Sequence, residues 1–117
     1  MNNRWSLEEE SLLAEVWLEV SQENYEKRSF WNEVVERFNN QSDGDHRNKN
    51  MVTSKWGRLS TECKNFNYIY KHVHRNIPDD NNRLQTTKRI FEERFGGRSF
   101  EYAHMWFILR NHPKWNE

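Results

Sequence analysis

The hydrophobic positions between Val52 and Val73 follow the spacing of an α-helix. Seven apolar or aromatic side chains recur there at intervals of 4, 3, 4, 3, 4 and 3, namely Val52, Trp56, Leu59, Cys63, Phe66, Tyr70 and Val73. This spacing places all seven on one stripe. The opposite side is polar and basic, and it carries Asn50, Ser54, Gly57, Thr61, Asn65, Tyr68, His72 and Arg75, flanked by Arg58 and Lys64. We therefore predict a helix about 33 Å long with one buried face, against which the other helices pack.

The segment 7–20 predicts a first helix. Ser6 and Glu9 have the spacing of a capping box, and the acids at the start of the segment suit the positive end of a helix dipole. Its apolar face consists of Leu12, Leu13, Val16, Trp17 and Val20, and Trp5 precedes the cap, where it can pack back on the first turns. We expect the acids to point away from this face: Glu8, Glu9, Glu10, Glu15 and Glu19.

A second helix is predicted after a polar connection at 21–27, with Ser29 as its cap. The apolar positions of this helix repeat the spacing of the first helix: Phe30, Trp31, Val34, Val35 and Phe38. The two helices are expected to pair through these faces. The segment 39–50 that follows contains no apolar residue. It predicts a mobile loop that leads into the long helix.

Two further helices are predicted after a break at 76–82, which contains Pro78. The fourth has a face of Leu84, Thr87, Ile90, Phe91 and Phe95, and it ends at Gly96 and Gly97. The fifth begins at Ser99 and ends before Pro113, with a face of Phe100, Ala103, Trp106, Phe107 and Leu109 or Arg110. We expect this pair to form a C-terminal extension (76–117) that packs on a three-helix core (1–75).

Composition agrees with one all-α domain. The chain has 117 residues, 15% of them aromatic, and only six Gly and Pro residues in total, so hairpin turns have few places to form. No window approaches 18 consecutive apolar residues, and residues 1–5 lack the apolar run of a signal peptide. We expect a soluble, intracellular protein.

The sequence contains few candidates for catalysis or metal binding. Cys63 is the only cysteine and lies on the apolar stripe, so it is interpreted as a core residue. None of the five histidines forms a metal-binding motif: His46, His72, His74, His104 and His112. There is no Gly-rich phosphate loop and no nucleophile motif. We expect no enzymatic activity, no metal site and no cofactor.

Charge is distributed unevenly although the formal net charge is zero. Residues 1–26 contain seven acids and one base, a net charge of −6, whereas residues 46–76 contain seven bases and one acid, a net charge of +6. This asymmetry indicates an electrostatic partner for the middle segment. The alternative interpretation is that the first and third helices attract each other within the protein.

Three tryptophans, Trp5, Trp31 and Trp56, lie near the starts of the first three helical segments and resemble the aromatic triad of Myb/SANT three-helix domains. The segment 4–13, the Phe30-Trp31 pair and the segment 53–56 resemble the plant trihelix and NAM-associated Myb/SANT-like class. The ending 97–115 is similar to the C-terminal signature of that class, with a Phe before His-x-Trp, then Ile-Leu and Pro-Lys-Trp. The resemblance spans nearly the whole chain.

This resemblance implies a helix-turn-helix type of fold and sequence-specific binding of double-stranded DNA through the third helix. It also implies a nuclear role in transcription or descent from a transposon-derived factor. Arg58 is the best candidate for reading a base, because a guanidinium fits guanine O6 and N7. The candidate contacts are Arg47, Lys49, Asn50, Thr53, Ser54, Lys55, Gly57, Arg58, Thr61 and Lys64, of which Arg47, Lys49, Lys55 and Lys64 are predicted to contact phosphates.

A second function is left open by the acidic first helix. SANT-like domains with acidic surfaces bind proteins, including histone tails. The chain could therefore be a protein-interaction module of a chromatin or regulatory complex that uses Glu8, Glu15 and Glu19. Neither function involves a membrane or a small-molecule substrate.

Overall fold

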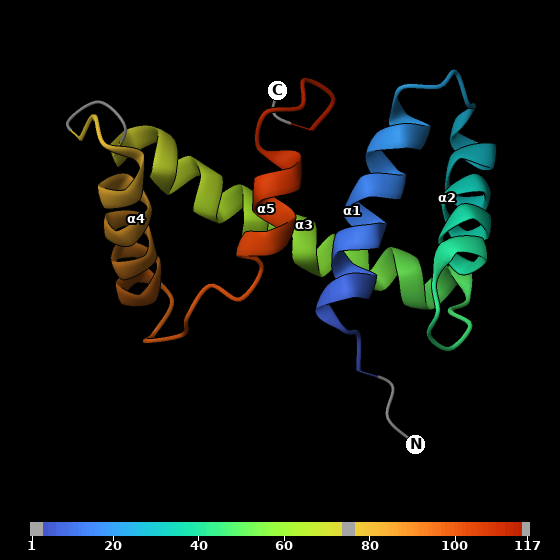
Figure 1. Cartoon of the computed structure of the whole chain (residues 1–117), viewed down its shortest axis with the longest axis horizontal. Coiled ribbons are helices and arrows are strands. Elements are labelled where there is room, and N and C mark those ends of the chain that lie inside the picture. Colours follow the sequence, from blue (N-terminus) through green and yellow to red (C-terminus); the bar gives the residue numbers. More distant parts are fainter. Residues whose placement is uncertain (1–3, 74–76, 116–117) are drawn as a thin grey trace. The chain divides into compact units, whose positions relative to one another are not determined.

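The computed structural model describes residues 4–73 and 77–115 and contains five α-helices (Figure 1). They are α1 (Leu7–Ser21), α2 (Lys27–Gln41), α3 (Lys49–Val73), α4 (Asp80–Arg94) and α5 (Ala103–Leu109). These described residues form no β-strand, which confirms the all-α class. No helix among them is long and apolar enough to cross a membrane.

The chain divides into two compact units. The first consists of Met1–Arg58 together with His104–Glu117, and the second consists of Leu59–Ala103. Helix α3 therefore contributes its N-terminal part to the first unit and the remainder to the second. This division differs from the expected core at 1–75 and extension at 76–117, because α5 groups with α1 and α2 and not with α4. That the whole chain is one domain stays a prediction.

Helix α1 begins as the sequence predicts. The Ser6 hydroxyl accepts a hydrogen bond from the Glu9 backbone N–H at 3.1 Å, and the Ser6 N–H donates to the Glu9 carboxylate at 3.1 Å. The reciprocal bonds satisfy two groups that a helix N-terminus otherwise leaves without partners. The capping box is confirmed.

The first unit is built on the expected pairing of α1 with α2, across which α3 passes (Figure 1). Leu13, Val16 and Val20 of α1 and Val34 and Phe38 of α2 are completely buried. The remaining positions of the two predicted faces are partly exposed: Leu12, Trp17, Phe30, Trp31 and Val35. The apolar periodicity therefore identified the buried sides of both helices.

Aromatic rings join α3 to this pair. Trp56 stacks on Trp17, with ring centroids 4.7 Å apart and an interplanar angle of 17°, and it also lies 6.4 Å from Trp31. Trp5 instead packs against Phe38 at 5.1 Å. Of the three tryptophans of the predicted triad, Trp31 and Trp56 therefore lie near each other, while the ring stacked on Trp56 is Trp17 and Trp5 packs on Phe38.

Several predicted boundaries are wrong. Helix α2 begins at Lys27 with Glu26 as its N-cap, so Ser29 lies in the first turn and caps nothing. Helix α5 begins at Ala103, and Ser99 instead donates a hydrogen bond to Glu92 at 2.9 Å. Phe107, assigned to the buried face of α5, is 50% exposed.

The second unit has its own aromatic core. Phe66 stacks on Phe100 at 4.1 Å and lies 6.1 Å from Phe91 of α4. Cys63 is completely buried, as expected, and its thiol donates to the Tyr102 carbonyl at 3.8 Å. Helix α4 ends at Arg94, and Gly96 and Gly97 follow its C-cap, Phe95, with φ angles of 67° and 83° that favour glycine. Arg75 and His74 lie outside the described residues.

Trp56→Ala tests the ring cluster of the first unit. Trp56 is 8% exposed and contacts rings from both α1 and α2, so its truncation should cost about 3–5 kcal/mol of unfolding free energy. The Tm should fall by more than about 10 °C. The matched control is Leu7→Ala, because Leu7 is 61% exposed. A Tm within a few degrees of the parent for Trp56→Ala would contradict the position of this ring.

Candidate nucleic-acid interface

The N-terminal part of α3 presents an exposed polar face. Lys49, Asn50, Ser54, Gly57 and Arg58 are all exposed, while Thr53 is partly exposed. The other side of this segment is buried through Val52 and Trp56. From Lys49 to Thr61 the sequence contains no acid. This part of the helix is therefore held by its apolar side and offers a positively charged, hydrogen-bonding side to solvent.

The start of α3 is fixed by Asn48, whose carbonyl Oδ1 accepts from the Met51 N–H at 2.9 Å. Such a cap stabilises a helix by about 1 kcal/mol. Thr53 Oγ1 donates to the Lys49 carbonyl at 2.9 Å, within the same turns. The positive end of the helix dipole thus coincides with Lys49, an arrangement that favours an anion such as a phosphate.

Gly57 has no packing reason to be a glycine. A Cβ atom added there would meet nothing within 4 Å, and Gly57 lies in the middle of α3. Glycine inside a helix costs about 0.5–1 kcal/mol relative to alanine. Gly57 therefore lowers the stability of the helix at a position where a larger side chain would fit. Because Gly57 is exposed and has no side chain, another molecule can approach the helix backbone closely there.

The remaining two candidates, Thr61 and Lys64, lie on the part of α3 that belongs to the second unit, and both are exposed. Their turns continue the stripe that carries Gly57. The structure thus places eight of the ten candidates at exposed or partly exposed positions: Lys49, Asn50, Thr53, Ser54, Gly57, Arg58, Thr61 and Lys64.

Arg47, a predicted phosphate contact, is buried and paired within the protein. Arg47 is only 3% exposed, and its guanidinium donates to both carboxylate oxygens of Glu9, at 3.0 and 3.2 Å. It also donates to the Arg4 carbonyl at 3.0 Å and lies 4.8 Å from the centroid of the Trp5 ring. A bidentate arginine beside an aromatic ring has its donors satisfied within the fold.

The backbone of Arg47 is held as well. The Asn39 side chain accepts from the Arg47 N–H at 2.9 Å and donates to the Arg47 carbonyl at 2.8 Å. The polar segment 39–50 was expected to be a mobile loop. In the structure α2 extends to Gln41, α3 begins at Lys49, and the short connection is anchored at Arg47 from two sides.

Lys55 forms a second ion pair with α1. Its ammonium lies 3.2 Å from Glu10, whose other oxygen lies 2.8 Å from His104 Nε2 of α5. Glu9 and Glu10 are both buried, so the expectation that all acids of the first helix point outward is wrong for these two. The alternative interpretation, attraction between the first and third helices, is confirmed for the Glu10–Lys55 pair, and Glu9 pairs with Arg47 in the connection just before α3.

The ion pair with Arg47 changes the acidity of Glu9. Burial raises the pKa of this carboxyl. Hydrogen bonds from Arg47 and from the Ser6 backbone N–H together lower the pKa by more than burial raises it, so it lies below its ordinary value. Glu9 is thus held as a carboxylate. Its ionised form is an integral part of the first unit.

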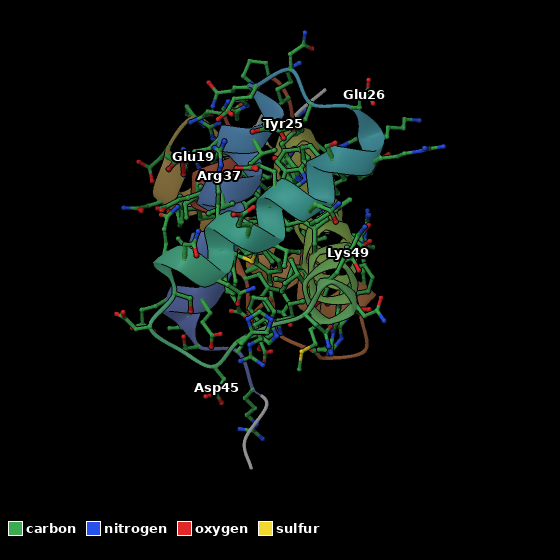
Figure 2. The ribbon with its side chains drawn as sticks, turned by 90° about the vertical axis from the view of Figure 1, so that its right-hand side faces the viewer. Glu19, Tyr25, Glu26, Arg37, Asp45 and Lys49 are labelled. Atoms are coloured by element: carbon green, nitrogen blue, oxygen red, sulfur yellow. The ribbon has the colours of Figure 1, made fainter. Side chains whose placement is uncertain are left out.

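The other acids of α1 lie on a different surface. Glu8, Glu15 and Glu19 are exposed. In Figure 2, Glu19 and Lys49 lie on opposite sides of α2. Glu19 therefore does not face the start of α3, where it would repel a phosphate.

A groove of about 530 Å³ lies beside these acids, between the start of α1 and the end of α2. It is lined by Ser6, Glu8, Glu9, Leu12, Gln41, Ser42, Asp43 and Gly44. A neighbouring hollow is lined by Leu7, Glu8, Ser11, Leu12 and Glu15. The lining of the two hollows thus combines the apolar side chains of Leu7 and Leu12 with the acids Glu8, Glu9, Glu15 and Asp43.

Sequence reasoning missed the residues that hold the interface in place. Four side chains position the start of α3, and the sequence predicted this role for none of them: Glu9, Glu10, Asn39 and Asn48. A local signal existed for Asn48, which lies three residues before Met51 at a helix start. No local signal existed for Glu9 and Arg47, which are 38 residues apart.

Comparisons with protein-family models, curated proteins and solved structures found no match to this chain. Within residues 4–73 and 77–115, no three His, Cys, Asp or Glu side chains are grouped so that they could hold a metal ion. The assignment of the candidate interface is therefore supported by its geometry and charge alone.

Glu9→Gln should destabilise the protein strongly at neutral pH, by about 3–5 kcal/mol, because Arg47 would be left buried without its counter-charge. The pKa of Glu9 is lowered in the folded state, so the stability that its carboxylate contributes is complete above about pH 4.3 and is lost as the pH falls through the folded pKa. The difference in Tm between parent and variant should therefore shrink in acid.

The control for this pH series is Glu23→Gln, which removes an exposed partner of Arg37 at the surface. Its effect on the Tm at pH 7 should be much smaller, because solvent screens an exposed ion pair. Equal losses for the two variants would contradict the assigned role of Glu9.

Proposed function

We propose that this protein binds double-stranded DNA in a sequence-specific manner through the N-terminal part of α3, without catalysing a reaction. The observation that carries the proposal is an exposed face, free of acids, on a helix whose other face is buried: Lys49, Asn50, Ser54, Gly57 and Arg58. The proposal excludes Arg47 and Lys55, whose charges are paired with α1.

In the proposed mechanism, the N-terminal part of α3 enters the major groove of the DNA. The major groove of B-DNA is about 12 Å wide and admits an α-helix. Asn50 and Ser54 can donate to and accept from base edges, and the bare backbone at Gly57 allows close approach. Arg58 supplies the fork that fits guanine O6 and N7. Lys49, at the positive end of the helix dipole, contacts a phosphate and sets the register.

The resemblance to Myb/SANT-like domains of the trihelix class supports the same assignment, because the third helix is the recognition helix of that family. It supports a helix-turn-helix arrangement of α1, α2 and α3 and a nuclear role in transcriptional regulation. The proposed site does not require a cofactor or a metal.

Arg58→Ala and Lys49→Ala separate base reading from charge attraction. A preferred site is first selected from a random duplex pool. On that site Arg58→Ala should cost about 1–3 kcal/mol and relax the preference at one base pair. Lys49→Ala should weaken all duplexes alike and lower the slope of log K against log salt by about one unit. Both effects are measured by fluorescence anisotropy over a salt series.

The matched control is Lys88→Ala, which removes one exposed positive charge from α4. It should change neither affinity nor salt slope. If selection returns no enriched motif and Arg58→Ala weakens all duplexes alike, the face is a non-specific basic patch. Duplex binding that is unchanged in both α3 variants would refute the proposed interface.

A second candidate function is supported by the groove at α1. Its lining includes the apolar Leu12 and the acids Glu8 and Asp43, which suit the stem and the ammonium group of a lysine side chain. Glu15 and Glu19 extend the negative surface along α1. We therefore propose, as the alternative, that this surface binds a basic segment of a protein partner.

The double reversal Glu15→Lys with Glu19→Lys distinguishes the two surfaces. It should leave duplex binding within a few-fold, because both acids are exposed on α1 and Glu19 lies on the opposite side of α2 from Lys49. It should weaken binding of a lysine-rich peptide by about tenfold or more, since like charges would then face each other. Isothermal titration with the peptide and with its acetylated form provides the comparison. A large loss of duplex affinity would place α1 at the DNA interface and refute the assigned geometry.

A further inference from the structure

A second exposed surface lies on the part of α3 that belongs to the second unit. Lys64, Tyr68, Lys71 and His72 are all exposed there, and their spacing places them on one side of the helix. Tyr68 is 59% exposed. The aromatic core of this unit, built on Phe66, does not include the Tyr68 ring.

The Tyr68 ring is held in position by the next turn of the helix. Nδ1 of His72 donates to the Tyr68 carbonyl at 2.9 Å, and the centroids of the two rings are 4.2 Å apart. The hydrogen bond to the backbone carbonyl holds the His72 ring, and the Tyr68 ring packs against that ring. A ligand that stacks on the exposed ring therefore loses less side-chain entropy on binding.

The charge around this ring favours an anion. Lys64 and Lys71 lie one turn before and one turn after Tyr68. The only acid in α3 is Glu62, and it forms an ion pair with Arg98. The surface therefore combines an exposed aromatic ring with two exposed lysines, one turn away on either side.

We propose that this surface binds single-stranded nucleic acid, with an unpaired base stacked on Tyr68 and the flanking phosphates held by Lys64 and Lys71. Surfaces that bind single strands without sequence preference combine these two elements, because every base has a face for stacking and every nucleotide a phosphate. In a duplex the bases are already stacked on each other and leave no face for the ring. The activity goes beyond duplex binding by the N-terminal part of α3 and does not depend on it.

The test uses the full chain and a fluorescein-labelled oligothymidylate of 12 nucleotides, measured by anisotropy at 50 mM salt. Tyr68→Ala should weaken binding by about 5- to 150-fold, which corresponds to the usual contribution of one stacked base. Tyr68→Phe keeps the ring and should bind within about twofold of the parent. Lys71→Ala should lower the salt slope by about 0.7.

Tyr25→Ala is the matched control, because Tyr25 is an exposed tyrosine that lies between the acids Glu23 and Glu26. It should not change binding. A second probe of 12 abasic nucleotides keeps the phosphates and removes the bases. Tyr68→Ala should leave affinity for this probe unchanged, because only stacking has been removed.

The outcomes separate this proposal from the duplex proposal. Arg58→Ala should affect the selected duplex and leave oligothymidylate binding within about twofold. No binding of oligothymidylate at 50 mM salt would overturn the inference, whatever the duplex result. So would an unchanged affinity in Tyr68→Ala, or an equal loss on the abasic probe, since either result would leave charge attraction alone.

Discussion

The buried ion pair between Glu9 and Arg47 is the interaction on which the first unit depends. It joins the first turn of α1 to the connection before α3, and Trp5 covers the guanidinium. Removal of either side chain alone would leave the other charge buried and unpaired, which costs several kcal/mol of unfolding free energy. The pair therefore determines where the chain enters α3, and with it the position of Lys49 and Asn50. A structural contact inside the protein in this way sets the geometry of a surface proposed to bind DNA.

The same pairing determines which charges remain for a partner. The segment 46–76 has a net charge of +6, but Arg47 and Lys55 are matched by Glu9 and Glu10. The exposed face at the start of α3 keeps a lysine, an arginine and several small polar side chains. With so few phosphate contacts, the salt dependence of binding should be moderate. In the proposed DNA complex, recognition by this face would depend on base edges and close approach more than on bulk charge.

Two kinds of surface follow one another along α3. In the first unit the exposed residues are small or polar around Gly57, which suits a helix that enters a groove. In the second unit the exposed residues are larger and include the Tyr68 ring beside lysines, which suits an unpaired base. A long helix can carry both because each unit buries a different set of its apolar side chains, Val52 and Trp56 in one and Cys63 and Phe66 in the other.

The sequence by itself determined the all-α class, the existence of the five helices, the capping box at Ser6 and the buried stripe from Val52 to Phe66. These features depend on local periodicity and on side chains within four residues of each other. Only the tertiary structure decided that Arg47 is buried, that Glu9 and Glu10 face inward and that α5 groups with α1. The physical reason is distance along the chain. The sequence gives the sign of each charge, but the packing of the helices determines which opposite charge lies beside it. Glu9 and Arg47, for example, are 38 residues apart.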